Sequence, residues 1–384
     1  MTIVYADNNA TTKVAPEVVA EMTTFLTEKW GNPSSMHQLG GDVEKAIESA
    51  REKVAACLGA AQPTEIIFTS GGTESDNTAI RSALASRKGR RKIITSRVEH
   101  PAVLNLCKNL EREGYQVRYL PVDNHGLLSL DDLREAMDED VALVTLMAAN
   151  NETGVLFPVE QAGEIAHEYG ALFHTDAVQA MGKVPVDLSF GHVDLLSVSG
   201  HKIHGPKGIG ALYVRRGCRF RPFIVGGHQE RGRRGGTENV PGIAAMGRAA
   251  ELALAHMADE QIRVKKLRDT LEEGLLKIPL SRVNGKTEKR LPGTSNISFK
   301  NVEGEALLLM LDQKGICASS GSACTSGTLE PSHVLRAMGV PFTYAHGSLR
   351  FSLGRYNTED DVTKILKELP PIVTRLRELS PFSG

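Results

Sequence analysis

Short apolar runs alternate with stretches of helical periodicity over the first two thirds of the chain. The apolar runs are rich in β-branched residues, as buried strands are. The expected strands are 65–70, 92–96, 116–121, 142–148, 171–175, 193–198 and 210–214. The helical patterns between them are 76–85, 102–113, 130–137 and 160–169. This alternation indicates βαβ units, so the sequence predicts an α/β fold with a mostly parallel sheet covered on both faces.

The pattern changes near Pro241, where a long helical stretch begins and runs over 242–276. A smaller set of elements follows, with expected strands 294–299, 316–319 and 348–353. The expected helices of this part are 303–314, 332–338, 358–369 and 372–379. The pair Pro370-Pro371 should break or kink the chain between the last two, because proline lacks the backbone N–H that a helix needs. This part reads as a separate α+β domain.

Composition narrows the function classes without identifying one. The chain has 384 residues, of which 41% are apolar and 24% charged, values typical of a soluble globular protein. No apolar run approaches the roughly 20 residues that a membrane-spanning helix needs, and the first residues lack a signal or transit pattern, which favours the cytoplasm. The formal net charge of −1 gives no electrostatic case for a nucleic acid or an anionic membrane as partner.

The cysteines indicate neither a disulfide framework nor a zinc ribbon, because their number is odd and no C-x-x-C pair occurs. They are Cys57, Cys107, Cys218, Cys317 and Cys324. Four of them are expected to be small buried hydrophobes. Cys324 differs, because it lies in the Ser- and Gly-rich stretch 319–327, which indicates a mobile loop. An exposed thiol there, with a pKa of about 8.5, would be thiolate to a few per cent at neutral pH.

Candidate chemistry lies where the expected strands end, since ligands of such sheets bind outside the carboxyl ends of the strands. The segment 71–75 (G-G-T-E-S) follows the first strand and opens a helix, which fits an anion site or an ordinary helix cap. Asp176 ends another strand, and Lys202 follows a third. A cofactor with a pyridine ring requires this pair: the lysine forms a Schiff base, and the acid holds the ring nitrogen protonated. The flanking S-G-H and G-P-K-G residues make an ordinary surface lysine a poor alternative.

From Tyr5 to Tyr356 the chain resembles the cysteine desulfurases of the nitrogen-fixation type, the NifS/IscS group of the class V aminotransferase fold. The segments that carry the resemblance occur in the family's order. They are Y-A-D-N-N-A-T-T (5–12), G-N-P-S-S-M-H (31–37), S-G-G-T-E-S-D-N (70–77), E-H-P-A-V (99–103), N-N-E-T-G (150–154), H-T-D-A-V-Q (174–179), S-G-H-K (199–202), R-G-G-T-E-N (234–239) and S-S-G-S-A-C (319–324).

The resemblance implies pyridoxal phosphate as cofactor, bound by a fold of the aspartate-aminotransferase type. It implies a large domain at 13–255 with a seven-stranded sheet, and a small domain formed by 1–12 and 256–384. Lys202 would hold the cofactor covalently, Asp176 would pair with the ring nitrogen, and Gln179 would hydrogen-bond the ring hydroxyl. His100 would stack on the ring and serve in proton transfer. The further cofactor-binding residues would be Gly72, Thr73, Asn151, Ser199, His201 and, from a second subunit, Thr237.

The resemblance also implies the substrate and the partners. L-Cysteine would bind through Arg350, which clamps its carboxylate, and Asn151 would contact the substrate or the ring. The Cys324 thiolate would take the sulfur as a persulfide and leave L-alanine. A homodimer would form, with the loop 226–239 as the crossing element, and a scaffold protein for iron–sulfur clusters, serving nitrogenase, would accept the sulfur. Taken alone, the stretch 226–236 reads as a solvated basic loop.

Three alternatives stay open at this level. Lys202 and Asp176 would serve a selenocysteine lyase, an aminotransferase or a carbon–carbon lyase of the same fold equally well. A non-enzymatic iron–sulfur scaffold would need clustered thiolates, which the spacing of the cysteines does not provide, although Cys324 could still be a transient cluster ligand. No resident metal site is expected. A nicotinamide enzyme would need a G-x-G-x-x-G turn after the first strand, and this chain has none there.

Overall fold

The structure is a computed structural model that describes residues 3–285, 287–320 and 331–379. Seven strands form its main sheet in the order β2-β8-β7-β6-β5-β3-β4. They are β2 (Ile66–Thr69), β3 (Lys92–Ser96), β4 (Gln116–Leu120), β5 (Val141–Met147), β6 (Leu172–Asp176), β7 (Leu195–Ser199) and β8 (Gly210–Val214). In this sheet β8 runs antiparallel to the other six strands. The predicted fold class is confirmed, and the bounds of these strands lie within two residues of those expected.

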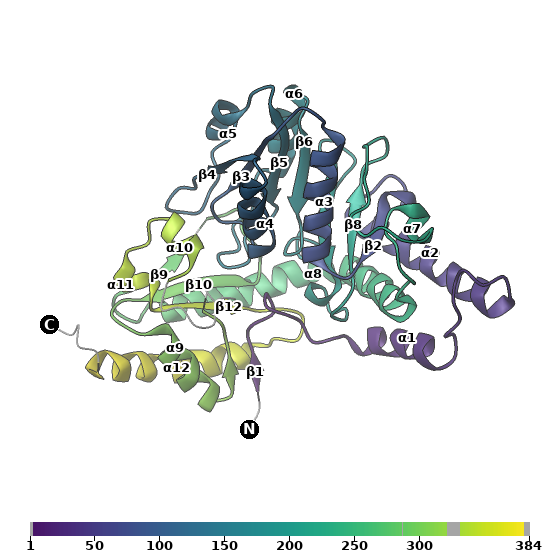
Figure 1. Ribbon diagram of the computed structural model, residues 1–384. Coiled ribbons are helices and arrows are strands. Elements are labelled where there is room, and N and C mark those ends of the chain that lie inside the picture. The colour runs from purple at the N-terminus through teal and green to yellow at the C-terminus, as the bar shows by residue number, and fades with distance from the viewer. Residues whose placement is uncertain (1–2, 286, 321–330, 380–384) are drawn as a thin grey trace.

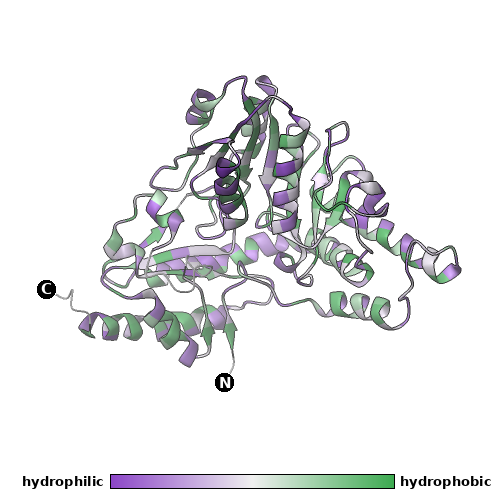
Figure 2. Ribbon diagram, in the orientation of Figure 1, coloured by the Kyte–Doolittle hydropathy of each residue, from purple (hydrophilic) through white to green (hydrophobic). Residues whose placement is uncertain are grey.

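Helices cover both faces of the main sheet (Figure 1). They are α2 (Gln38–Leu58), α3 (Gly72–Ser86), α4 (Pro101–Arg112), α5 (Leu130–Ala136), α6 (Val159–Glu168) and α8 (Val240–Leu275), and α1 (Pro16–Thr27) packs on α8. Successive strand residues point to opposite faces. Ile66 and Phe68 therefore join the core with α2 and α8, whereas Ile67 joins the core with α3 and α4. Figure 2 shows the strands of the sheet mostly in the hydrophobic colour and the covering helices striped, as two-sided burial requires.

A second core lies beside the smaller sheets. In the three-stranded sheet, β10 (Thr294–Phe299) pairs antiparallel with β9 (Ser281–Asn284) and β12 (Ser348–Ser352). The N-terminal strand β1 (Val4–Tyr5) pairs parallel with β11 (Ile316–Cys317). The helices here are α9 (Gly304–Gln313), α10 (His333–Ala337), α11 (Phe342–Ala345) and α12 (Glu359–Leu379). Because α8 contributes Val264, Leu267 and Leu271 to this core as well, one helix connects both parts (Figure 1).

The expected break at Pro370-Pro371 is wrong, because both prolines lie inside the continuous helix α12. Each proline removes a backbone N–H from the helix. Leu369, Ile372 and Val373 are nevertheless buried on one side of it, in the core shared with α8 and α9. Helix stability in proteins comes mostly from such an apolar face, so packing outweighs the missing backbone hydrogen bonds.

A buried ion pair fixes the Gly- and Arg-rich stretch 226–236, which contains the short helix α7 (Gln229–Gly232). The Glu230 side chain is 3% exposed, and its carboxylate accepts two hydrogen bonds from the Arg51 guanidinium, at 2.7 and 3.0 Å. It also accepts from the backbone N–H of Phe68. The interpretation of this stretch as a solvated loop is therefore wrong at Glu230, which ties the loop to α2 and β2.

We expect Glu230→Gln to lower the free energy of unfolding by about 3 kcal/mol, because it leaves the Arg51 charge buried without its counter-ion. Urea unfolding followed by circular dichroism measures the change. Glu168→Gln is the control, since it breaks an exposed pair with Arg134 and should leave the unfolding midpoint unchanged. Equal midpoints for both variants would contradict a structural role of the Arg51–Glu230 pair.

Burial separates the described cysteines. Cys57 and Cys107 are buried as expected, and burial raises the pKa of each thiol to about 12. Cys218 and Cys317 are only half-buried, so the expectation of buried cysteines is wrong for these two. In the part of the chain that the structure describes, no helix is long and apolar enough to cross a membrane.

Candidate active site

A cavity of about 350 Å³ opens at the carboxyl ends of the main-sheet strands. Of the residues singled out in the sequence, those on its wall are Gly72, Thr73, His100, Asn151, Asp176, Gln179, Ser199, His201, Lys202 and Arg350. Asn9, Ala10, Asp76, Met147, Ala149 and Val178 complete the lining. The structure thus brings the predicted residues together from five strand ends and from β12. Thr237 is exposed and is not among the lining residues, and Cys324 lies outside the described residues.

The N-terminal segment holds the loop that carries Lys202. This lysine ends the short 3-10 helix Gly200–Lys202, which directly follows β7. Its amine donates hydrogen bonds to the carbonyl oxygens of Asn9, at 2.5 Å, and Ala10, at 2.8 Å. Thr12 donates to the carbonyl of His201 through both its backbone N–H and its hydroxyl. The amine is therefore held inside the cavity wall by neutral acceptors rather than pointing into solvent.

Asp176 supplies a carboxylate at the end of β6, where its Oδ1 accepts from the backbone N–H of Val178 at 2.9 Å. A second acid, Asp76 on α3, faces the same cavity, and its buried Oδ1 makes no hydrogen bond but lies 3.6 Å from His174 Nε2. Burial raises the pKa of both carboxyls, more for Asp76. The Val178 N–H and the positive Lys202 oppose this rise in the pKa of Asp176, which favours the ionised form at Asp176 over Asp76. This arrangement places one negative charge at Asp176.

The layer beneath these acids is polar but uncharged at neutral pH. Burial lowers the pKa of the His174 imidazole to about 3, and His174 bonds Thr145 and Ser197 through its two ring nitrogens. Burial raises the pKa of Glu99 to about 8, although Ser96 and the N–H of Met147 hydrogen-bond one of its oxygens. No competing anion therefore lies in this layer to oppose the charge on Asp176.

His100 lies at the start of α4, where its Nδ1 accepts from the backbone N–H of Ala102. Burial, and then the positive charge of Lys202, lowers the pKa of the imidazole to about 4. The ring is therefore neutral at physiological pH. Because Nδ1 is an acceptor, the proton is on Nε2, which remains available for a ligand.

The first turn of α3 offers a place for an anion. Gly72 and Thr73 line the cavity at this helix end, where backbone N–H groups and the positive end of the helix dipole favour negative charge. A Cβ on Gly72 would lie 2.8 Å from Val178 Cγ2, so only glycine fits between the helix start and the turn after β6. Ser199 and His201 lie on the same cavity wall.

Arg350 brings a guanidinium from β12 to the opposite wall. Its side chain is 4% exposed, and it donates to Asp7 Oδ1 at 2.7 Å and to the carbonyl of Asn151 at 3.2 Å. Its Nε is buried and has no hydrogen-bond partner. A planar guanidinium with an unsatisfied donor at a cavity suits a carboxylate ligand.

Sequence reasoning missed three residues of this site. Asn9 joins the two parts of the molecule, since its backbone N–H donates to Ser352 Oγ, and its carbonyl accepts from Lys202 and from Gln179 Nε2. Asp76 and Lys183 are the other two. Asn9 and Asp76 fall inside motifs that carry the family resemblance, which is the signal that pointed to them, whereas nothing in the sequence pattern marked Lys183.

Comparison with known proteins agrees with this geometry. The family model described as aminotransferase class V matches residues 4–365. A cysteine desulfurase of Trichormus azollae is 60% identical over 385 residues, which cover 100% of this chain and 96% of that protein. The cysteine desulfurase NifS of Azotobacter vinelandii is 55% identical over 383 residues, covering 100% of this chain and 95% of its own. The solved structure of a NifS-like protein has a TM-score of 0.92 at 43% identity, covering 98% of this chain and 100% of its own.

The fold and the matched family define a class V aminotransferase-type enzyme, and the chain belongs to that family. Within the family it belongs with the NifS-like cysteine desulfurases. Membership implies pyridoxal phosphate. The residues present fit this cofactor, because the cavity holds a lysine amine, an ionised carboxylate, a neutral imidazole and a glycine-lined helix start.

Proposed function

We propose that this enzyme removes the sulfur of L-cysteine, passes it on as a persulfide on Cys324, and supplies iron–sulfur cluster assembly for nitrogenase. The observation that carries the chemistry is the convergence of Lys202, Asp176, His100 and Arg350 on one cavity. The name of the Azotobacter relative and the resemblance to the nitrogen-fixation type support the nitrogenase role.

Each wall of the cavity has a role in this proposal. Lys202 anchors the cofactor, and its amine then takes the proton from the substrate Cα. Asp176 holds the ring nitrogen protonated, Gln179 bonds the ring hydroxyl, and His100 covers the ring. When bound, pyridoxal phosphate supplies an electron sink for charge that develops at the substrate carbon. The residues that would hold the phosphate are Gly72 and Thr73 at the start of α3, Ser199, His201, and Thr237 of a second subunit.

The sulfur transfer balances without an external oxidant. The Cys324 thiolate attacks the substrate sulfur, so a sulfur–sulfur bond forms while the bond between Cβ and sulfur breaks. The electron pair of the broken bond stays with the substrate carbon, which takes up a proton and becomes the methyl group of alanine. The products are a Cys324 persulfide and L-alanine, and a sulfur acceptor protein then receives the terminal sulfur.

The wild-type holoenzyme tests this function directly. Incubation with L-cysteine should yield alanine, and intact-protein mass spectrometry should show a gain of one sulfur atom, mapped to Cys324. Capture of the acceptor from a nitrogen-fixing cell, with identification of a cluster scaffold, tests the nitrogenase role. Alanine formation without persulfide would contradict the transfer step. Light scattering tests the homodimer that the role of Thr237 requires.

Arg350→Lys should raise KM for L-cysteine about 10- to 100-fold, because a lysine cannot reproduce the two-point grip of a guanidinium on a carboxylate. The change in kcat should be smaller, since the carboxylate is bound before and after the reaction. Steady-state kinetics over a range of cysteine concentrations measures both parameters. Arg355→Lys is the matched control, because that arginine is engaged with Glu260 on α8 rather than with the cavity around Lys202 and Asp176. An unchanged KM in Arg350→Lys would contradict substrate binding by Arg350.

A further inference from the structure

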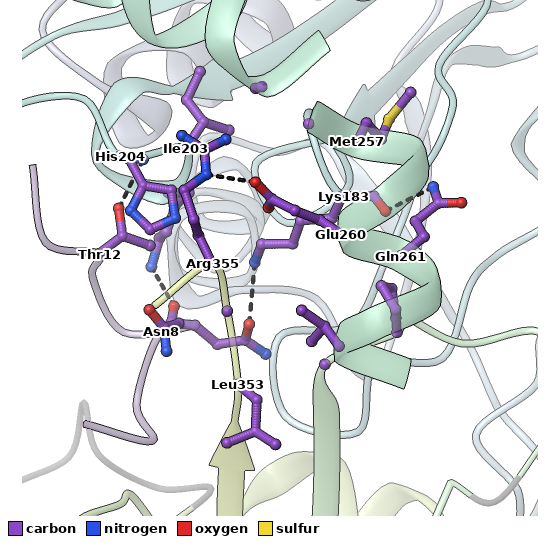
Figure 3. Close-up of a pocket in the computed structure, with 18 of the residues that line it drawn as sticks. Asn8, Thr12, Lys183, Ile203, His204, Met257, Glu260, Gln261, Leu353 and Arg355 are labelled. Atoms are coloured by element: carbon purple, nitrogen blue, oxygen red, sulfur yellow. Dashed lines mark hydrogen bonds and ion pairs between the residues drawn. The ribbon is translucent and has the colours of Figure 1, made fainter. Parts of the chain in front are cut away.

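Lys183 places a second lysine amine beside the active-site cavity. Its Nζ donates hydrogen bonds to Gln179 Oε1, at 2.7 Å, and to Asn9 Oδ1, at 3.1 Å. Figure 3 shows Lys183 in the wall of a smaller cavity of about 50 Å³, between helix α8 and the N-terminal segment. Lys202 borders both cavities, so Lys183 and Gln179 form part of the layer between them.

The backbone around Lys183 is held firmly. Gln179 and Lys183 lie four residues apart in the turn that follows β6, a spacing that brings side chains to the same side. Gly182 has a φ of +70°, and a Cβ there would lie 2.8 Å from Ala253 Cβ on α8. Gln261 Nε2 donates to the carbonyl of Lys183 at 2.9 Å. The turn is therefore clamped to α8, and the amine has a fixed place.

Two fixed partners decide which way the Gln179 amide faces. A lysine amine bonds here as a donor, so Lys183 requires the amide oxygen on its side. The carbonyl of Asn9 can only accept, and it takes a hydrogen bond from Gln179 Nε2 at 2.9 Å. The amide nitrogen has a second N–H, which is left for a ligand in the cavity. Without the Lys183 partner, only the Asn9 carbonyl would hold the amide in this orientation, and the amide would be less firmly fixed.

We propose that Lys183 is a positioning residue that holds the Gln179 amide with an N–H toward the cavity, so that the site selects a ring oxygen able to accept. This inference rests on the proposed function, in which Gln179 bonds the ring hydroxyl of the cofactor. The hydrogen bond from Gln179 is strongest when the accepting oxygen is negatively charged. Gln179 and Lys183 therefore favour the deprotonated form of the ring oxygen.

The charges around Lys183 are consistent with this role. Burial, and then the positive charges of Lys202 and Arg350, lower the pKa of the Lys183 amine to about 7. From α8, Glu260 faces the same small cavity but pairs with Arg355, and the structure records no ion pair between Lys183 and any acid that it describes. A neutral amine still has two N–H groups. Both protonation states therefore keep the hydrogen bonds to Gln179 and Asn9.

The test compares Lys183→Met with Lys183→Gln in the holoenzyme. Lys183→Met removes the donors and should weaken pyridoxal phosphate binding about 10-fold, which cofactor absorbance during dialysis titration measures. It should also shift the cofactor's visible absorption band, because the ring oxygen loses its fixed donor. Lys183→Gln retains N–H donors and should recover most of the binding. Lys92→Met is the control, since Lys92 also donates to a carbonyl and a carboxylate but lies at the far end of β3.

The double variant Lys183→Met with Gln179→Ala separates positioning from general stability. If Lys183 acts through Gln179, adding Lys183→Met to a Gln179→Ala protein should change cofactor binding little beyond the effect of Gln179→Ala alone. Additive effects, or a Lys183→Met band identical to the wild type, would overturn the proposal. Borohydride reduction of the wild-type holoenzyme, followed by peptide mapping, tests the proposed function independently. If the label is on Lys202 but the effects of the two substitutions are additive, the role of Lys183 is rejected and the proposed function is retained.

Discussion

Lys202→Ala should lower L-alanine production from L-cysteine by about 10⁴-fold or more, since it removes the proposed anchor of the cofactor, which is also the proposed base for the substrate proton. The cavity would keep Asp176, His100 and the start of α3, so some cofactor should still bind without a covalent bond. Borohydride treatment should therefore trap the cofactor on the wild-type protein and leave the variant unlabelled. Amino acid analysis of the products measures the loss of activity.

Lys265→Ala is the control, because Lys265 is exposed on α8 and pairs with Asp269. It should retain both the label and the activity. The mapping must also resolve Lys183, which is the other lysine amine near this cavity wall. Label on Lys183 in the wild-type protein, or activity of Lys202→Ala within 10-fold of wild type, would reject the assignment of Lys202.

Cys324→Ala should bind pyridoxal phosphate normally and yet form alanine about 10³-fold more slowly, because it lacks the nucleophile that we propose accepts the sulfur. The residue lies outside the described part of the chain, so this expectation rests on the sequence. The absorption spectrum should still change when L-cysteine is added, since Lys202, Asp176 and Arg350 remain. Stopped-flow absorbance and alanine analysis together separate substrate binding from sulfur transfer.

Cys317→Ala is the matched control for that variant. Cys317 is half-buried at the end of β11, where burial and the nearby Asp312 and Asp7 raise the pKa of its thiol. A thiol that resists ionisation is a poor nucleophile, so this variant should keep its activity. Persulfide on Cys317, or full activity in Cys324→Ala, would contradict the division of roles between the two cysteines.

The central sheet could be predicted closely because its strands, apart from the edge strand β4, are buried on both faces. Such strands read as continuous apolar runs bounded by polar turns, and β3 and β8 begin and end where expected. The helices α1 and α2 were not predicted, although α2 ends on Gly59 in the left-handed conformation that such helix ends favour. The error at Pro370-Pro371 has a different origin. There the two prolines are a strong local signal for a helix break, but packing of the apolar face of α12 outweighs it.

The site could be predicted where chemistry coincides with a strand end. Asp176 ends β6, and Lys202 ends the short 3-10 helix that follows β7, so their meeting follows from the parallel order of the strands. Asn9 and Lys183 depend instead on hydrogen bonds between segments far apart in the sequence. The contact between Asn9 and Ser352 spans 343 positions, and no local pattern encodes it.

The N-terminal segment, whose Asn9 and Ala10 line the cavity, also limits when the protein can take up its cofactor during synthesis. Asn9 leaves the ribosome long before the strand that contains Arg350 and Ser352 is made, since 343 positions separate Asn9 from Ser352. Until Arg350 and Ser352 are in place, the cavity around Lys202 is incomplete. A nascent chain should therefore bind the cofactor poorly. Loading is therefore expected after release, and a bulky fusion at the N-terminus that disturbs this wall should yield pale, cofactor-poor protein even when the main sheet is intact.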